Sequence, residues 1–334
     1  MEKNLSNLFV DLVFGVAVGD ALGCPVQFFS REEVKSFNIK GMVGHGTYDM
    51  PAGTWTDDTS MALCLVDSLA EKGELDFDDI MKKFVRWMVG NEYTPHGKAF
   101  DMGETCISAV FNYKKRGLPP LECGGKKENQ NGNGSIMRIA PLAFYLLEKF
   151  GLDAFDSDEA FDATHKVSSL THAHEIALIG CDIYLASILE AIRGRKKDEI
   201  LKNVLPKIQA FVERNPRFAA AFEKYGRIFK DDFAALPEDS ISSSGYVLHT
   251  LEAALWSFLT TDSYEDCLLK VINLGSDTDS VGAVAGGLAA VYYSGVEGKS
   301  IPENWVSKIQ NMDLIEKIVT KYLSSRSSLS KSAC

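Results

Sequence analysis

The chain has 334 residues, 46% of them hydrophobic and 24% charged, so it is long and apolar enough to bury a large core. Its formal net charge of −11 opposes binding to a phosphate backbone, and no cluster of lysine and arginine reverses that charge locally. These properties argue against a disordered chain and against a nucleic-acid-binding protein.

Cysteine usage and the amino-terminal segment indicate the compartment. The seven cysteines are odd in number and scattered, which is typical of thiols in a reducing compartment rather than of a disulfide framework. The apolar stretch 8–22 is interrupted by Asp11 and Asp20 and is followed by no small-residue cleavage site. Neither a signal peptide nor a membrane span is expected, and we predict a cytoplasmic protein that binds no membrane.

Helical periodicity dominates the chain, and strand-like alternation is nearly absent. Apolar residues recur at helical spacing over 61–69 and 80–88, and Gly73 and Gly90 are expected to end these helices. Further helices are expected over 173–193, 246–259, 264–274, 281–293 and 303–323, with peripheral helices in the charged stretch 196–244. Two long loops, 41–56 and 112–135, are expected to be functional. The sequence thus predicts an all-α domain over residues 1–323 and a disordered tail over 324–334.

Two of the helical segments carry small residues at every fourth position. The first has Gly15, Gly19 and Gly23, and the second has Gly282, Gly286 and Ala290. Such faces allow close approach either of two central helices or of a ligand, and both explanations remain open.

An acidic cluster precedes each of two apolar helices. Thr56-Asp57-Asp58-Thr59 comes before the helix expected from Met61, and Ser276-Asp277-Thr278-Asp279-Ser280 comes before the second glycine-rich segment. One explanation is helix capping, because Asp and Thr satisfy the free amides of a helix amino terminus. A cap needs only one side chain, however, and each cluster carries two aspartates.

If the two clusters meet inside the fold, their carboxylates must be neutralised. Four aspartates carry the charge that two divalent cations balance, and ligands made only of oxygen favour Mg²⁺, Mn²⁺ or Ca²⁺. Zinc fits less well, because no cysteine pair has ligand spacing and His172 and His174 do not share a helix face. The interpretation requires contact between segments about 220 residues apart.

Five runs in the chain together carry a resemblance to a known family. They are Gly19-Asp20-Ala21-Leu22-Gly23, Gly53-Thr54-Trp55-Thr56-Asp57-Asp58-Thr59, Phe100-Asp101-Met102-Gly103-Glu104-Thr105, Gly132-Asn133-Gly134-Ser135-Ile136-Met137-Arg138 and Asp277-Thr278-Asp279-Ser280-Val281-Gly282-Ala283. In this order, and with the weaker match Thr171-His172, they resemble the ADP-ribosylglycohydrolase family, whose members remove ADP-ribose from arginine, from serine or from dinitrogenase reductase.

The resemblance implies a single orthogonal bundle of helices around a binuclear Mg²⁺ or Mn²⁺ site. The implied metal ligands are Thr56, Asp57, Asp58, Asp277, Asp279 and Ser280. The implied substrate is an ADP-ribosylated protein or ADP-ribose itself, bound by Asn133, Gly134, Ser135 and His172. Arg138 is expected either to contact phosphate or to bond helix ends and carboxylates. The chain is expected to act as a monomer.

Catalysis is assigned by the same resemblance to Asp101, Asp58 and Gln27, with Asp101 as the group that transfers a proton. Capping of the following helix is the alternative role for Asp101. Gln27 stands where many catalytic members have a glutamate, and a glutamine carbonyl can ligate a cation but cannot accept a proton. Three functions therefore remain open: a hydrolase that acts on arginine adducts rather than serine adducts, a metal- and ADP-ribose-binding protein with little turnover, and a structural relative of the crystallin kind.

Overall fold

The computed structural model describes residues 4–329, and these residues contain α-helices, short 3-10 turns and isolated bridges but no β-strand. The all-α prediction is confirmed for this part of the chain. In chain order the helices are α1 (Leu5–Gly23), α2 (Arg31–Phe37), α3 (Asp57–Lys72), α4 (Phe77–Gly90), α5 (Glu104–Arg116), α6 (Leu142–Phe150), α7 (Asp158–Ser169), α8 (Glu175–Ile192), α9 (Lys197–Arg214), α10 (Ala219–Lys224), α11 (Val247–Leu259), α12 (Tyr264–Ile272), α13 (Thr278–Tyr293), α14 (Glu303–Val306) and α15 (Met312–Leu329).

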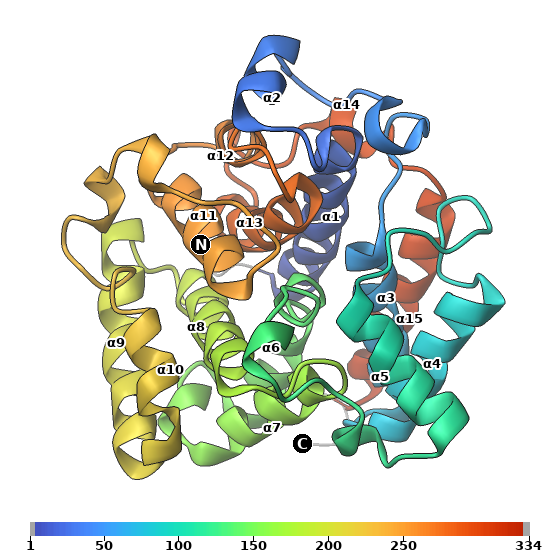
Figure 1. Cartoon of the computed structure of the whole chain (residues 1–334), viewed down its shortest axis with the longest axis vertical. Helices are drawn as coiled ribbons and strands as arrows, with labels where there is room; N and C mark the ends of the chain where they lie inside the picture. Colours follow the sequence, from blue (N-terminus) through green and yellow to red (C-terminus); the bar gives the residue numbers. More distant parts are fainter. Residues whose placement is uncertain (1–3, 330–334) are drawn as a thin grey trace.

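Helices α1 and α13 pack against each other at the centre of the molecule (Figure 1). A Cβ atom added at Gly19 would lie 2.0 Å from the Gly282 carbonyl oxygen, and one added at Gly15 would lie 2.5 Å from that of Gly286. The two small-residue faces therefore fill one another, and the explanation by tight helix packing is confirmed. Backbone occupies the space that a ligand would need on these faces.

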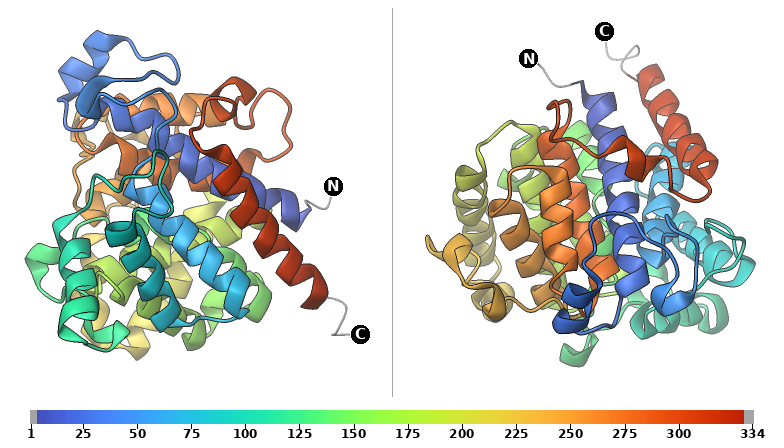
Figure 2. Two further views of the ribbon diagram at one scale, coloured as in Figure 1. Left: turned by 90° about the vertical axis from the view of Figure 1, so that its right-hand side faces the viewer. Right: turned by 90° about the horizontal axis from the view of Figure 1, so that it is seen from above.

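The remaining helices surround this pair, as Figures 1 and 2 show. Helices α3, α4, α5 and α15 lie on one side and α8, α9 and α10 on the other, with α9 and α10 at the edge of the molecule. The stretch 196–244 thus contains the peripheral helices that its composition predicts.

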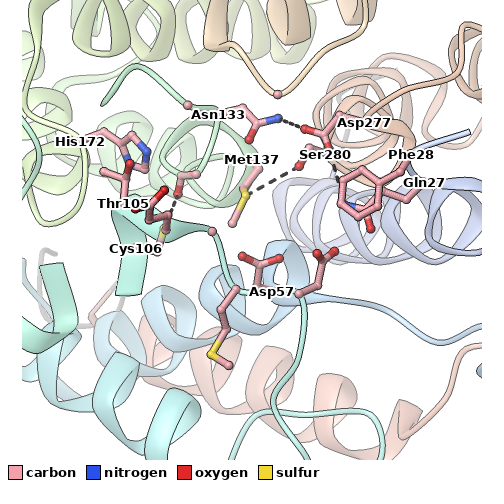
Figure 3. A pocket seen from close by; sticks show the side chains of 17 residues that line it. Gln27, Phe28, Asp57, Thr105, Cys106, Asn133, Met137, His172, Asp277 and Ser280 are labelled. Carbon is pink, nitrogen blue, oxygen red and sulfur yellow. Dashed lines mark hydrogen bonds between the residues drawn. The ribbon is translucent and has the colours of Figure 1, made fainter. Parts of the chain in front are cut away.

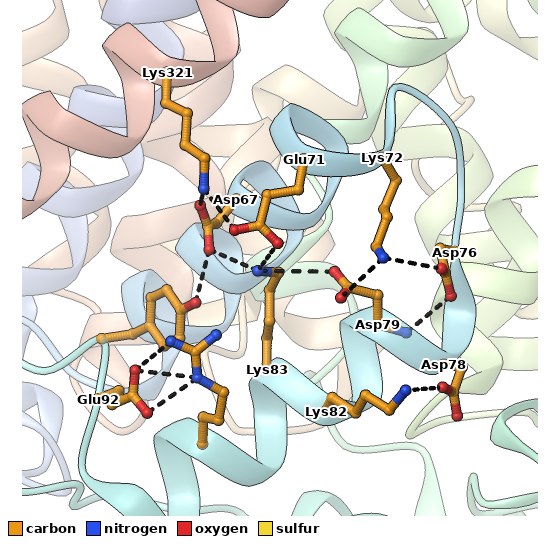
Figure 4. A network of polar contacts seen from close by, with 12 residues as sticks. Asp67, Glu71, Lys72, Asp76, Asp78, Asp79, Lys82, Lys83, Glu92 and Lys321 are labelled. Atoms are coloured by element: carbon orange, nitrogen blue, oxygen red, sulfur yellow. Dashed lines mark hydrogen bonds and ion pairs between the residues drawn. The ribbon is translucent and has the colours of Figure 1, made fainter.

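Figure 4 shows a polar network that ties α3, α4 and α15 together. Asp67 of α3 accepts hydrogen bonds from Lys83 Nζ at 2.7 Å, Lys321 Nζ at 2.6 Å and the Tyr93 hydroxyl at 2.7 Å. The side chain of Lys83 is 1% exposed, so its buried charge depends on the Asp67 carboxylate.

Several helix ends differ from the predictions. The left-handed residue after α4 is Asn91, at φ 58°, rather than Gly90, whereas Gly73 ends α3 as expected at φ 74°. The single helix predicted over 303–323 is two helices, separated where Asn311 adopts φ 50°. Helix α15 extends to Leu329, so residues 324–329 of the predicted tail are helical, and 330–334 lie outside the described residues.

The segment Leu5–Val26 is long and apolar enough to cross a membrane, and it is the one such helix in the described part of the chain. Other segments of the protein bury 89% of its apolar window. A central helix of a globular core has the same property, so this segment is weak evidence for a membrane span.

Candidate functional site

The first acidic cluster lies at the start of α3, which begins at Asp57 rather than at Met61. The amino terminus of this helix is capped from another helix: Asp20 of α1 accepts hydrogen bonds from the amides of Thr56 and Thr59, at 2.9 and 3.0 Å, and from both hydroxyls. Asp20 thus satisfies donors that a local cap would otherwise have to meet. Asp57 and Asp58 are therefore not needed as the cap of α3, and Asp58 Oδ2 accepts a hydrogen bond of 3.1 Å from the Thr56 hydroxyl.

The second cluster opens α13 without capping it, because the side chain of the N-cap residue Asp277 makes no cap hydrogen bond. The Asp277 carboxylate instead accepts hydrogen bonds from Asn133 Nδ2 at 2.6 Å and from Gln27 Nε2 at 3.3 Å. Asp279, in the first turn of the helix, is fully buried, and neither of its carboxylate oxygens has a hydrogen-bond partner among the described residues. Three segments distant in sequence therefore meet at Asp277.

The two acidic clusters lie side by side. The Ser280 hydroxyl is 3.5 Å from Asp58 Oδ2 although the two residues are 222 positions apart. Burial raises the pKa of Asp58 well above its ordinary value, and the nearby charges of Asp20, Asp277 and Asp101 raise it further. The contact between the clusters that the sequence interpretation requires is present in the fold.

Burial also raises the pKa values of Asp57, Asp279 and Asp20. Burial, followed by the charges of Asp58 and Asp101, raises the pKa of Asp57 well above its ordinary value. Burial and the charges of Asp277 and Asp101 do the same for Asp279. Burial also raises the pKa of Asp20 to about 7, in spite of the four groups that donate to it. The cluster must therefore be neutralised, either by protons or by bound cations.

The buried oxygens provide a test of whether cations fit. Five of them have no hydrogen-bond partner within residues 4–329: Gln27 Oε1, Asp58 Oδ1, Asp101 Oδ2 and both carboxylate oxygens of Asp279. All are hard oxygen donors, the class that Mg²⁺ and Mn²⁺ prefer. In the same residues no group of three or more His, Cys, Asp or Glu side chains is already arranged as a metal site. The donor set fits the predicted cations, and the binuclear centre itself stays a proposal.

A cavity of about 310 Å³ is lined by residues of both acidic clusters, Asp57 from the first and Asp277 and Ser280 from the second (Figure 3). Its wall contains eight of the residues predicted for the site: Gln27, Asp57, Asp101, Asn133, Gly134, His172, Asp277 and Ser280. Thr56, Asp58 and Asp279 do not line it and are buried next to it. Phe28, also in the wall, is 66% exposed and adopts φ 70°, a backbone conformation unusual for a bulky residue.

Asp101 lies in the cavity wall in a strained conformation, at φ 56°. It does not cap α5, whose N-cap residue is Gly103. Its Oδ1 atom accepts a hydrogen bond of 2.5 Å from the Tyr48 hydroxyl, and its Oδ2 atom has no partner in the described part of the chain. The capping alternative for Asp101 is therefore wrong.

Two residues of the 132–138 run have side chains that lie outside the cavity wall. Ser135 is fully buried away from the cavity, and its hydroxyl lies 3.6 Å from the Cys181 sulfur. The prediction that its side chain binds substrate is therefore wrong. Arg138 is also fully buried, lies outside the cavity wall and donates to the main-chain carbonyls of Gly134 and Val167, the latter in the last turn of α7. Of its two expected roles, bonding to a helix end is confirmed and contact with a phosphate in the cavity is not.

Two residues of the site had no predicted role. Asp20 belongs to one of the five runs, and a carboxylate inside an apolar helix is a signal that could have indicated a buried polar role. Tyr48 lies in the loop 41–56, and no spacing connects it with Asp101, 53 residues away.

Comparison with known proteins agrees with this geometry. The model of the ADP-ribosylglycohydrolase family matches residues 1–331. The chain is 34% identical to the ADP-ribosylarginine hydrolase Tri1 of Pseudomonas putida (strain GB-1) over 306 residues, which cover 92% of this chain and 75% of the relative. It is 30% identical to the ADP-ribosyl-[dinitrogen reductase] glycohydrolase of Rhodospirillum rubrum over 298 residues, which cover 88% of this chain and 87% of that protein.

A solved structure supports the same assignment. A chain described as an ADP-ribosylglycohydrolase-related protein complex superimposes with a TM-score of 0.72 and 29% identity, covering 96% of this chain and 98% of that one. The match thus extends over the whole fold as well as over the motifs of the site. The chain belongs to the ADP-ribosylglycohydrolase family.

Proposed function

We propose that the protein is a metal-dependent hydrolase that removes ADP-ribose from a modified arginine side chain by cleaving the bond at ribose C1. The observation that carries this proposal is the convergence, at the wall of one cavity, of buried carboxylates whose oxygens in part have no hydrogen-bond partner within residues 4–329. The relatives named for ADP-ribosylarginine hydrolysis favour arginine as the modified side chain.

Two divalent cations, Mg²⁺ or Mn²⁺, are proposed to be held by Thr56, Asp57, Asp58, Asp277, Asp279 and Ser280. When bound, such cations orient ribose hydroxyls, lower the pKa of water and stabilise developing negative charge. The chain prepares this site in two ways. Asp20 caps α3 and so keeps Asp57 and Asp58 available, and Asn133 fixes the Asp277 carboxylate by a hydrogen bond of 2.6 Å.

Asp101 is proposed to transfer the proton at the scissile bond. The Tyr48 hydroxyl holds Oδ1 and leaves Oδ2, which has no partner among the described residues, to take up or release a proton. Asn133, Gly134 and His172, which line the same cavity, are proposed to contact the ADP-ribosyl group. Figure 3 shows Asn133 and His172 among the lining side chains.

Gln27 supports a second candidate function, the binding of ADP-ribose and metal with little turnover. Its amide donates to Asp277, an interaction that a glutamate in the ionised state cannot make, and it offers no group that accepts a proton. Gln27 thus stabilises the Asp277 carboxylate by a hydrogen bond but cannot act as a general base.

A release assay distinguishes these functions. ADP-ribosyl-arginine and ADP-ribosyl-serine peptides are incubated with the native chain and with Mg²⁺, Mn²⁺ or EDTA. Cation-dependent release of ADP-ribose from the arginine peptide supports the hydrolase, and loss of that release in Asp57→Asn and Asp279→Asn supports the proposed cation ligands.

Other outcomes favour the alternatives. If calorimetry shows tight binding of ADP-ribose but the native chain releases none from the peptides, and Gln27→Glu gains release activity, the binding protein is favoured. Failure of the native chain to bind both ADP-ribose and cations points to a structural protein.

A further inference from the structure

Arg138 is a buried cation that donates only to neutral groups within residues 4–329. Its Nε atom donates to the Gly134 carbonyl at 3.0 Å, and Nη2 donates to the Val167 carbonyl at 3.3 Å and to the Thr171 hydroxyl at 2.8 Å. Its guanidinium carbon lies 4.8 Å from the centre of the Phe84 ring. Because arginine has only donors, the Thr171 oxygen must act as an acceptor toward it.

The Thr171 hydroxyl keeps one proton, which it can donate. His172 Nδ1 lies 2.9 Å from this oxygen, and the Cys106 thiol is a second neighbour of the hydroxyl. A thiol sulfur is a weak acceptor, whereas an unprotonated imidazole nitrogen is a good one. The hydroxyl proton is therefore directed to Nδ1, which leaves the ring proton of a neutral histidine on Nε2.

The surroundings keep this histidine neutral. Burial, followed by the charge of Arg138, lowers the pKa of His172 to about 3. The residue is 2% exposed and its main chain is fixed by Ser168, which donates from its hydroxyl to the His172 carbonyl at 2.9 Å. Protonation at both nitrogens is thus disfavoured near neutral pH.

His172 belongs to the cavity wall, on the side that carries Asn133 (Figure 3). Its Nε2 atom has no hydrogen-bond partner among residues 4–329, whereas Nδ1 is used by Thr171. A Cβ atom at Gly134 would lie 2.7 Å from His172 Cε1, so the glycine provides the space in which the ring lies.

We propose that Arg138 and Thr171 are positioning residues that hold His172 as the neutral Nε2–H tautomer, so that the ring donates a hydrogen bond into the cavity to an acceptor oxygen of ADP-ribose. The choice of ligand rests on the proposed function, whereas the choice of tautomer rests on the contacts alone. Diphosphate and hydroxyl oxygens share the required acceptor chemistry.

Nitrogen NMR of ¹⁵N-histidine-labelled protein tests the tautomer without any ligand. In the native chain we expect a protonated Nε2 and an unprotonated Nδ1 for His172, unchanged from about pH 5 to about pH 8. Thr171→Val removes the hydroxyl at nearly constant volume and is expected to populate the other tautomer. Thr171→Ser keeps the hydroxyl and is expected to restore the native signals.

ADP-ribose titration by calorimetry tests the consequence. Thr171→Val is expected to weaken binding about threefold to tenfold, the effect of one hydrogen bond, and Thr171→Ser to bind as the native chain does. Thr164→Val is the matched control, because Thr164 is fully buried and its hydroxyl donates to the Ala160 carbonyl inside α7. This control should change neither the tautomer nor the affinity.

A native His172 protonated on Nδ1 overturns the proposal, as does a Thr171→Val protein with native signals and native affinity. If Thr171→Val does not fold, the native chain and Thr171→Ser still decide the tautomer. If the native chain does not bind ADP-ribose, the proposed function fails, and the nitrogen signals by themselves support or overturn the positioning role.

Discussion

Replacement of Gln27 by glutamate is expected to make the stability of this protein depend on divalent cations. The Gln27 side chain is 4% exposed and donates to Asp277 Oδ1 at 3.3 Å. Glutamate of the same length would place a second carboxylate at this distance from Asp277. At an effective dielectric constant of about 20, two unit charges so close repel each other by roughly 5 kcal/mol.

Protonation limits this cost. Holding a glutamate with an ordinary pKa of about 4.3 in the neutral form at pH 7 costs about 4 kcal/mol, so the variant is expected to lose at most about that much stability without cations. For a chain of this length the loss corresponds to a melting temperature lower by about 5–10 °C. Bound Mg²⁺ or Mn²⁺ would neutralise both carboxylates and remove most of the difference.

Thermal unfolding of the native chain and Gln27→Glu, each in EDTA and in Mn²⁺, measures the effect. Gln310→Glu is a matched control: its amide donates to the Ala52 carbonyl at 2.9 Å, so the same change breaks a hydrogen bond without creating a carboxylate pair. Its loss of stability should be the same with and without Mn²⁺. An equal loss in both solutions for Gln27→Glu, or no loss in EDTA, would refute the placement of this side chain against a cation-binding cluster.

Three further changes test other parts of the structure. Gly19→Ala places a methyl group 2.0 Å from the Gly282 carbonyl oxygen and is expected to abolish soluble expression, whereas Gly90→Ala, whose nearest neighbour would be a Glu92 side-chain oxygen at 3.7 Å, should melt near the native temperature. Burial opposes ionisation of Asp67, but hydrogen bonds from Lys321, Lys83 and Tyr93 prevail and lower its pKa. Urea unfolding should therefore show that Asp67 stabilises the protein above about pH 4 and that this stabilisation is lost as the pH falls through the native pKa. The Asp67→Asn variant should not show this pH-dependent loss. Phe28→Ala removes an exposed ring from the cavity wall. It is expected to lower kcat/KM for ADP-ribosyl-arginine about threefold to fivefold, the effect of losing a cation–π contact between the Phe28 ring and the substrate guanidinium. The affinity for ADP-ribose, which has no guanidinium, should stay unchanged in calorimetry.

The sequence alone determined the helical class and the positions of the two acidic clusters along the chain. Helix periodicity and glycine stops are local properties, so the segments over 173–193, 246–259 and 264–274 correspond to α8, α11 and α12. The order of five motifs indicated the family, which the match over residues 1–331 shows. The pair of small-residue faces also predicted a close contact, although two partners for it remained open.

The tertiary structure alone decided which side chain performs which task. Asp20 caps a helix 36 residues further along the chain, and the Tyr48 hydroxyl donates to Asp101, 53 residues away. Contacts between residues so distant in sequence produce no periodic pattern from which they could be predicted. Ser135 stands beside Asn133 and Gly134 in one motif, yet its side chain contacts Cys181 instead of the cavity. Motif spacing fixes which residues are near each other along the backbone, whereas the direction of each side chain follows from packing against helices that are distant in sequence.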